Sequence, residues 1–275
     1  MRDSVQIENL AAAHIIELFS SCKRITPWIK TGDREPLWDG FLYLYDSEEH
    51  NVTTTRGRVS CQVKGKELAT SPETETFYLT YEELENYLRD GGILFFVVHI
   101  DNPEKPSFWA KLTPVELRTL LKELKDSQNK GKTVTLNRMP DKLSLCEAET
   151  FDFYQHCQLQ KAPPIDMAKV SHSGNHFRVV GIRQNGTHPI VALTKGFHYL
   201  YNCDENDSVL NVVGDTQYSF EISKEVDDGI TVGGKSFAVP VRLVAAKGAA
   251  RLMVGDFMSI DIIAEAGADR KFFSR

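Results

Sequence analysis

The segment GRVSCQVKGK (57–66) contains two residues, Gln62 and Lys64, whose types and spacing could do chemistry. Apolar Val59, Cys61 and Val63 alternate with polar residues, which is typical of a strand with one buried face. Gln62 and Lys64 would therefore project from the same face, just before a glycine ends the run. A carboxamide oxygen and an amine held side by side could bind a cation and a phosphate.

An aspartate that could join this pair is Asp39, in the segment PLWDGFLYLY (36–45). Asp39 precedes a strand whose alternate members are aromatic, and the intervening DSEEHNVTTTRG (46–57) is rich in polar, loop-forming residues. The two strands could therefore pair as a hairpin. Such a hairpin would place Asp39 near the far end of the second strand, beside Gln62 and Lys64.

A second carboxylate could come from the segment IENLAAAHIIELF (7–19), which is expected to be a helix packed on this sheet. Both Glu8 and Glu17 lie on it. Mg²⁺ is bound by one or two carboxylates, by waters and by substrate phosphates. The lysine could help to deprotonate an attacking water or could offset the charge of the phosphate. Together these groups are suited to hydrolysing a phosphodiester bond.

The elements that must position these residues follow an α/β pattern as far as residue 145. Thr80 and Glu83 form a capping box that begins a helix over 80–90, and Pro114 begins another that continues to 124. We expect a mixed sheet with helices packed on it, that is, an α/β fold. The expected strands are 40–45, 59–64, 93–100, 107–112 and 134–136.

The chain changes character after residue 150, where short apolar strands separated by turns replace the helix signals. This spacing is typical of an all-β sandwich or barrel. The expected organisation is an α/β domain over 1–145, a linker over 146–164 that includes QLQKAPP, and a β-rich domain over 165–275. The sequence does not indicate whether the β-rich domain senses, docks or assembles.

Asp39 followed by Gln62-Val63-Lys64 on the next strand resembles the core of the PD-(D/E)xK nuclease superfamily. The resemblance is closer to the prokaryotic branch with Q-x-K, which is found as effector domains of antiphage defence proteins. The segments LWDGFLYLY, VSCQVKGKEL, FYLTYEELENYLRDGGILFFVVHI and SFWAKLT carry the similarity, over about residues 5–140. A tryptophan precedes Asp39 where the family usually has proline or tyrosine.

The resemblance implies a restriction-endonuclease-like mixed sheet and a Mg²⁺-dependent endonuclease, with Mn²⁺ able to replace Mg²⁺. Asp39, Gln62 and Glu8 would be metal ligands, and Lys64 the catalytic lysine. Glu8 is favoured over Glu17 because its helix opening resembles the glutamate–small–small opening of the family's first helix. The substrate would be nucleic acid, with DNA favoured, and the β-rich domain could support a homo-oligomer or a larger defence complex.

Composition sets further limits on function. The 275 residues carry a formal net charge of −6, so the protein as a whole does not attract nucleic acid. Contacts with phosphates would therefore depend on a local basic cluster formed by Arg56, Arg58 and Lys66 with Lys64. The longest apolar run, 92–98, is too short to span a bilayer. The five cysteines are scattered and no secretory signal is visible, so a cytoplasmic, membrane-free protein is expected.

Two other functions remain open from the sequence. Polar residues on a solvent-facing strand explain an isolated Q-x-K equally well. The α/β domain could therefore be a catalytically inactive nuclease fold that binds DNA or a protein without cutting it. Alternatively, the β-rich domain could recognise a ligand or partner while the first half serves as its scaffold.

Overall fold

The computed structural model describes residues 2–31, 38–166, 176–182, 193–194, 196–204, 206, 208–222, 229–232, 234–238, 241–246, 249–255 and 258–263. The chain divides into two compact units, Met1–Gln158 and Leu159–Arg275. They are called unit 1 and unit 2.

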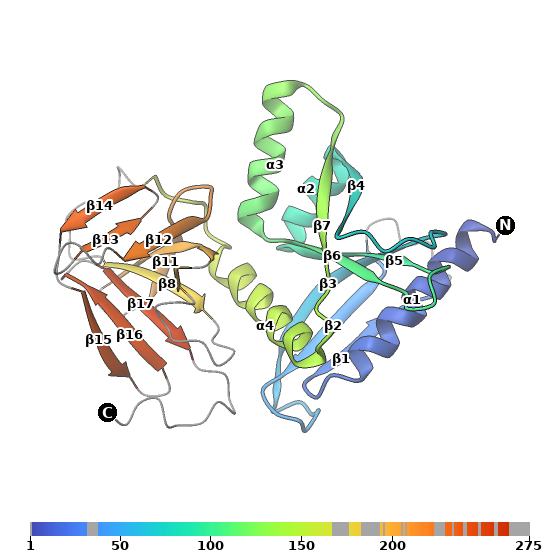
Figure 1. Cartoon of the computed structure of the whole chain (residues 1–275), viewed down its shortest axis with the longest axis horizontal. Helices are drawn as coiled ribbons and strands as arrows, with labels where there is room; N and C mark the ends of the chain where they lie inside the picture. The colour runs from blue at the N-terminus through green and yellow to red at the C-terminus, as the bar shows by residue number, and fades with distance from the viewer. Residues whose placement is uncertain are drawn as a thin grey trace. The chain divides into compact units, whose positions relative to one another are not determined.

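The described residues of unit 1 form a seven-stranded sheet with the order β1-β2-β3-β5-β6-β7-β4 (Figure 1). Strands β3 and β5 pair in parallel, whereas the other neighbouring strands pair antiparallel. The expectation of a mixed sheet with flanking helices is therefore confirmed. The strands are β1 (Ile25–Ile29), β2 (Gly40–Tyr45), β3 (Thr55–Lys66), β4 (Thr74–Thr80), β5 (Ile93–His99), β6 (Ser107–Leu112) and β7 (Gly131–Arg138).

Two helices of unit 1 begin where the sequence signals them. The capping box of Thr80 and Glu83 begins one helix, and Thr113 caps a second helix whose first residue is Pro114. One hydrophobic cluster joins α1 and α4 to one face of the sheet, and another joins α2 and α3 to the opposite face. The helices are α1 (Ser4–Ser20), α2 (Tyr81–Asp90), α3 (Pro114–Ser127) and α4 (Leu143–Leu159).

Helix α4 occupies most of the segment that was expected to be a linker over 146–164. Its residues Cys146, Phe151, Phe153 and Cys157 are buried in the same cluster as the inner side of α1. The segment is therefore part of the core of unit 1, and the division between the units lies after Gln158 instead of near residue 145. The strong helix signals of α2 and α3 are missing here, because α4 has no capping box and is rich in aromatic residues.

The described residues of unit 2 are rich in strands, as expected for residues 165–275. The other residues of that segment lie outside the described ranges. Its described strands form a six-stranded sheet, β11-β10-β8-β17-β16-β15, and a four-stranded sheet, β14-β13-β12-β9. Val179 and Leu200 of the first sheet share a hydrophobic cluster with Phe220 and Ile230 of the second. The strands are β8 (His176–Ile182), β9 (Phe197–His198), β10 (Leu200–Cys203), β11 (Val209–Val212), β12 (Tyr218–Ile222), β13 (Gly229–Val232), β14 (Lys235–Ala238), β15 (Val241–Ala246), β16 (Ala249–Val254) and β17 (Met258–Ile263).

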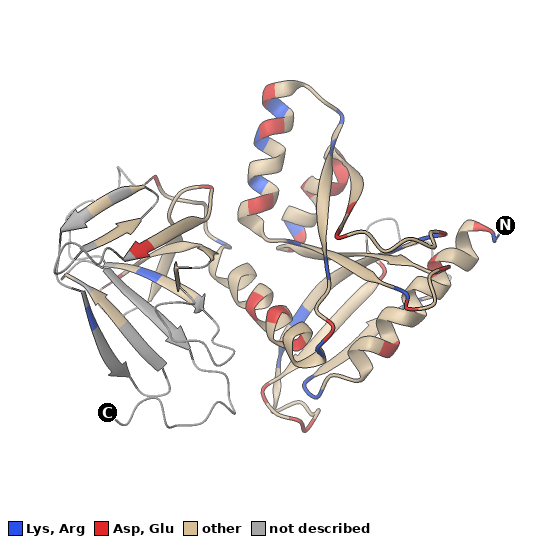
Figure 2. Ribbon diagram, in the orientation of Figure 1, with Lys and Arg blue, Asp and Glu red and all other residues tan. Residues whose placement is uncertain are grey.

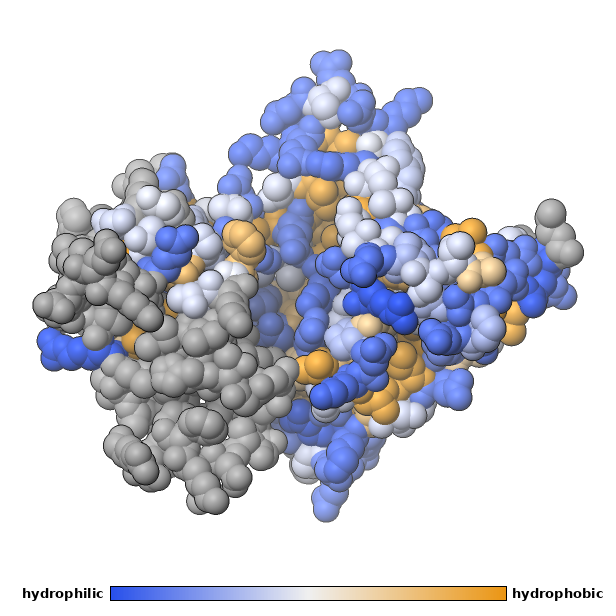
Figure 3. All heavy atoms as spheres, in the orientation of Figure 1, coloured by the Kyte–Doolittle hydropathy of each residue, from blue (hydrophilic) through white to orange (hydrophobic). Residues whose placement is uncertain are grey.

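The described surface of unit 1 is predominantly hydrophilic in the view of Figure 3, with smaller hydrophobic areas between the polar side chains. Basic and acidic positions alternate along α3 in Figure 2. All five cysteine side chains are buried. Among the described helices, none combines the length and the apolar character needed to cross a membrane.

Candidate active site

The candidate site lies where β2 stops pairing with β3. Gly40 is the first residue of β2 and lies opposite Cys61, and the Asp39 backbone N–H donates to the Cys61 carbonyl oxygen over 2.9 Å. Beyond this point β3 continues to Lys66 and pairs there with β5. A strand edge without a partner strand presents backbone groups that need another acceptor or donor.

The Asp39 side chain supplies one such acceptor. The Val63 backbone N–H donates to Asp39 Oδ2 over 2.6 Å, and Gln62 Nε2 donates to the same oxygen over 2.9 Å. The hairpin predicted from the sequence therefore brings Asp39 and Gln62 together. The carboxylate is held in place by a backbone group and by a side chain of the neighbouring strand.

The other amide atom of Gln62 has a different environment. Gln62 is only 6% exposed, and its Oε1 is buried without a hydrogen-bond partner in the described part of the chain. Buried polar atoms are nearly always paired, so an unpaired carbonyl oxygen needs an explanation such as an absent ion or water. The atom in question is the one that the resemblance assigns to the metal.

Lys64 and Glu8 complete the group. Lys64 Nζ donates to Glu8 Oε1 over 2.9 Å, and the two side chains are 29% and 51% exposed. Glu17 lies nine residues further along α1, about 13 Å along the helix axis. Of the two glutamates considered from the sequence, Glu8 is the one that the structure brings to Lys64.

Two glycines allow the elements of the site to approach one another closely. A Cβ on Gly65 would lie 2.6 Å from the Ile7 carbonyl oxygen, so α1 could not lie at its present depth against β3. A Cβ on Gly40 would lie 2.1 Å from the Trp28 carbonyl oxygen. The glycines that follow Lys64 and Asp39 in the sequence therefore set how closely Glu8 and β1 approach the site.

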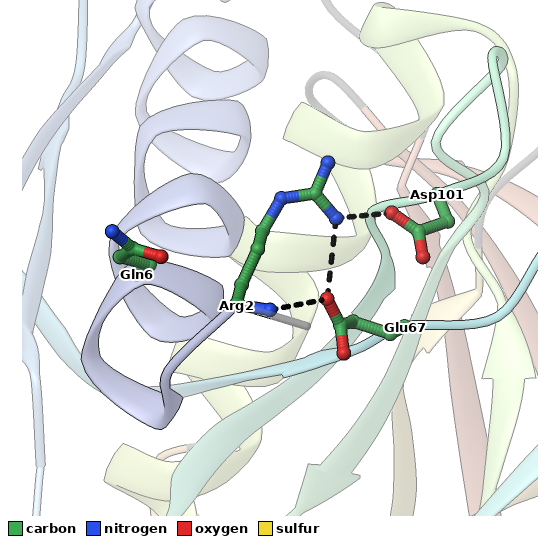
Figure 4. Close-up of a pocket in the computed structure, with 4 residues that line it drawn as sticks. All are labelled: Arg2, Gln6, Glu67 and Asp101. Carbon is green, nitrogen blue, oxygen red and sulfur yellow. Dashed lines mark hydrogen bonds and ion pairs between the residues drawn. The ribbon is translucent and has the colours of Figure 1, made fainter.

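The start of α1 is tied to the ends of β3 and β5 by Arg2, which the sequence analysis did not single out. Its guanidinium lies between Glu67 and Asp101 and pairs with both carboxylates, and its backbone N–H donates to Glu67 Oε1 over 3.3 Å (Figure 4). With Gln6, these residues line an open recess of about 750 Å³. The ion pairs help to fix the position of the helix turn that carries Glu8.

Burial and nearby charges act on Asp39 in opposite directions. Partial burial raises the pKa of the Asp39 carboxyl above its usual value, and the Glu8 carboxylate raises it further. The Val63 N–H, the Lys64 ammonium and the Gln62 amide each lower that pKa, but the net shift is upward. Ionised Asp39 is thus held at an energetic cost, which a bound cation would offset.

The donor set fits a hard cation in type, although it is sparse. No group of three or more His, Cys, Asp or Glu side chains suited to a metal occurs among the described residues. Two carboxylates and a carboxamide oxygen nevertheless meet the needs of Mg²⁺, which keeps several waters. Turning the Gln62 amide over would direct Oε1 toward Asp39 Oδ2, and a cation between the two oxygens would remove their repulsion.

The basic residues expected to contact phosphates do not form one cluster. The pairing of β2 with β3 shifts register at Tyr45, which lies opposite Thr55, so Arg56 is an extra residue on β3. Arg56 lies over Phe151 of α4 and pairs with Asp46, whereas Arg58 lies over Phe41. Lys66, eight residues beyond Arg58, pairs with Glu75 over 3.1 Å. Arg58, unlike Arg56, lies on the face of β2 that carries Asp39.

Comparisons of this chain with models of known families, with curated proteins and with solved structures find no match. The resemblance to PD-(D/E)xK nucleases therefore depends on the residues quoted above.

Proposed function

We propose that unit 1 is a metal-dependent nuclease that hydrolyses phosphodiester bonds of nucleic acid, with DNA favoured, on a restriction-endonuclease-like fold. The observation that supports this most strongly is the convergence of Glu8, Asp39, Gln62 and Lys64 at one edge of β3. These residues come from three elements and are spread over 56 positions of the chain. Gln62 Oε1 has no hydrogen-bond partner among the described residues, and turning the amide over would bring it to Asp39 Oδ2, where a cation between the two oxygens would be favourable.

In this proposal each residue has a distinct role. The Asp39 carboxylate, Gln62 Oε1 and the Glu8 carboxylate hold the cation, Mg²⁺ or Mn²⁺ in its place. The bound cation supplies Lewis-acid stabilisation of the charge that develops on the phosphate. The Lys64 ammonium orients the attacking water or pairs with a phosphate oxygen. Before cation and substrate bind, the ion pair with Glu8 keeps Lys64 at the site.

A catalytically inactive binding module is the second candidate, and one observation favours it. The Gln62 amide nitrogen faces Asp39, and Lys64 pairs with Glu8, so hydrogen bonds already occupy the two carboxylates that a cation would need. Glutamine is also a neutral ligand and attracts a cation less than glutamate does. In such a module the same fold would bind a strand without cutting it.

Metal binding and cutting separate the two candidates. The purified chain would be titrated with Mg²⁺ and Mn²⁺ while its thermal unfolding is followed, and would be incubated with plasmid, single-stranded DNA and RNA. We expect metal to raise the unfolding midpoint, because a ligand of the folded state stabilises it. Cutting should require Asp39 and Lys64. Binding of nucleic acid with no cutting under any of these conditions would favour the inactive module.

The setting of this activity follows from the same resemblance. We place the protein in prokaryotic antiphage defence, acting in the cytoplasm, with unit 2 sensing a trigger, docking a partner or assembling copies of the chain. If unit 2 were instead the working part, it would bind the trigger by itself. A fragment beginning at Leu159, assayed for ligand or partner binding beside the full chain, tests that alternative.

A further inference from the structure

A pair of aromatic rings lies beside the candidate site on the first two strands of the sheet. Trp28 of β1 and Phe41 of β2 are opposite each other in the antiparallel register, with ring centroids 6.1 Å apart and planes within 14° of parallel. Trp28 is 51% exposed although it is one of the largest apolar side chains. Stacked on the Phe41 ring, Trp28 presents a flat apolar surface to solvent.

Two cations flank the rings. The Arg58 guanidinium lies 4.0 Å from the Phe41 ring centroid, and Lys30 Nζ lies 5.5 Å from that of Trp28. Both distances are within the range of cation–π contacts. Trp28, Lys30, Phe41 and Arg58 together are called the aromatic platform here. It combines flat rings with positive charge, although the chain as a whole has a net charge of −6.

The platform is on the same face of the sheet as Asp39 and Gln62. The alternate residues Ile29, Leu42 and Val59 of its three strands are buried on the opposite face, against α1. Asp39 and Phe41 are two residues apart, so their side chains leave this face about 7 Å from each other. The Lys30 backbone N–H donates to the Asp39 carbonyl oxygen over 2.9 Å, which joins the platform directly to the site.

We infer that the aromatic platform stacks an unpaired base of the nucleic-acid strand whose phosphodiester lies at Asp39. This inference rests on the proposed function and names its substrate class as single-stranded nucleic acid, either DNA or RNA. Successive bases of single strands stack on aromatic side chains in grooves of positive charge. A paired base within a duplex is already stacked on both sides, so the Trp28 ring has no free base face to meet there. The positive charges of Arg58 and Lys30 attract the phosphates on either side of the stacked base.

Binding measured without cutting tests the inference. Fluorescein-labelled oligo(dT), oligo(U) and a blunt duplex would be titrated with the full chain in EDTA, and the anisotropy would be followed. We expect both single strands to bind more tightly than the duplex. Trp28→Leu should weaken single-strand binding roughly tenfold while Trp28→Phe keeps most of it, because stacking needs an aromatic face. Arg58→Ala should weaken binding and reduce its salt dependence.

Tyr78→Ala is the matched control, because Tyr78 is 52% exposed and lies on β4, at the other edge of the sheet from β1. It should leave binding unchanged. Equal binding by wild type and Trp28→Leu, tighter binding of the duplex, or no binding by wild type would each overturn the inference. A change in the oligomeric state of Trp28→Leu would also overturn it, by indicating a second copy of the chain as the occupant.

Failure of the proposed function would be seen separately. A wild-type protein that binds single strands through Trp28 but cuts nothing with Mg²⁺ or Mn²⁺ would support the platform and contradict the nuclease. Conversely, if cutting depends on Lys64 while Trp28→Leu cuts and binds single strands as wild type does, the nuclease would stand and the platform would not.

Discussion

Lys64 and Glu8 are 56 positions apart in the chain, and their side chains meet with Nζ and Oε1 separated by 2.9 Å. The lysine comes from the end of β3 and the glutamate from the first turns of α1. The ion pair is partly exposed, and such pairs contribute little to stability. The ion pair adds little stability, yet Gly65 and the ion pairs of Arg2 hold its two elements together. This is expected if the pair is kept for function.

Replacing Lys64 by alanine should abolish cutting and leave the fold intact. Loss of a general acid–base or phosphate-binding group lowers the rate by roughly a hundredfold or more. Loss of a partly exposed ion pair should lower the free energy of unfolding by about 1 kcal/mol or less. Cleavage rates and urea unfolding of the variant would be compared with those of wild type.

Lys132→Ala is the control for this variant, because Lys132 pairs with Glu123 on the surface of the same unit. It should lose a similar amount of stability and no activity. A Lys64→Ala protein that cuts at the wild-type rate would show that the site is wrongly assigned.

Replacing Asp39 by asparagine should raise the unfolding midpoint at pH 7 without metal, and should abolish metal binding. Burial raises the pKa of Asp39 in the folded state, so the folded state binds this proton more tightly than the unfolded state does. The contribution of Asp39 to stability therefore falls as the pH rises through its raised pKa, and its ionised form costs stability at neutral pH. The advantage of asparagine should disappear below the ordinary value of 3.8.

Thermal unfolding of wild type and Asp39→Asn in EDTA, from pH 7 to below 3.8, measures the difference in their unfolding midpoints. In Mg²⁺ the order should reverse, since only the wild type gains stability from the cation. An asparagine variant that is less stable than wild type at pH 7 in EDTA would show that ionised Asp39 does not lower the stability of the folded state. The half-saturating concentration of Mg²⁺ for wild type should also rise as the pH falls, because protonated Asp39 binds a cation poorly.

Replacing Gln62 by glutamate should make the protein more dependent on metal. A second carboxylate next to Asp39 repels it in EDTA and lowers the unfolding midpoint, whereas a cation between the two is bound more tightly. The rise in the midpoint caused by Mg²⁺ should therefore be larger than in wild type, with half-saturation at a lower concentration. Gln158→Glu adds the same charge at an exposed position and should change neither. An unchanged half-saturation point in Gln62→Glu would show that Gln62 does not contact the metal.

A fragment ending at residue 160 should fold, and a fragment ending at residue 145 should not. The shorter one lacks Phe151 and Phe153, which are buried in the core of unit 1. Their burial contributes roughly 3–6 kcal/mol, at about 1.5–3 kcal/mol for each side chain. That amount is comparable with the total stability of a typical domain, about 5–15 kcal/mol. Circular dichroism during thermal unfolding would measure the cooperativity of each fragment.

Limited proteolysis gives an independent measurement of the same boundary. Because α4 is packed against the sheet, cleavage of the full chain should begin after Leu159 and not within 146–159. Cooperative unfolding of the fragment that ends at residue 145 would show that α4 is dispensable for the core.

The sequence by itself determined several elements of unit 1 and the pair Asp39–Gln62. Alternation predicted β2 and β3, capping residues predicted the starts of α2 and α3, and a polar loop predicted the hairpin. These features depend on interactions between residues close in the chain, and an antiparallel hairpin fixes its register locally. Asp39 and Gln62 could therefore be predicted to be neighbours on one face of the hairpin without knowledge of the tertiary structure.

Only the tertiary structure decided which glutamate reaches Lys64, because that depends on how deeply α1 packs over Gly65. It also placed α4 in the core, since the apolar residues of α4 are buried in one cluster with residues of distant strands, such as Leu42 and Trp109. The register shift at Arg56 separated it from Arg58, only two positions along the sequence, and the pairing of β1 with β2 brought Trp28 beside Phe41. In each case the deciding energy comes from packing between distant segments, which a local pattern does not encode.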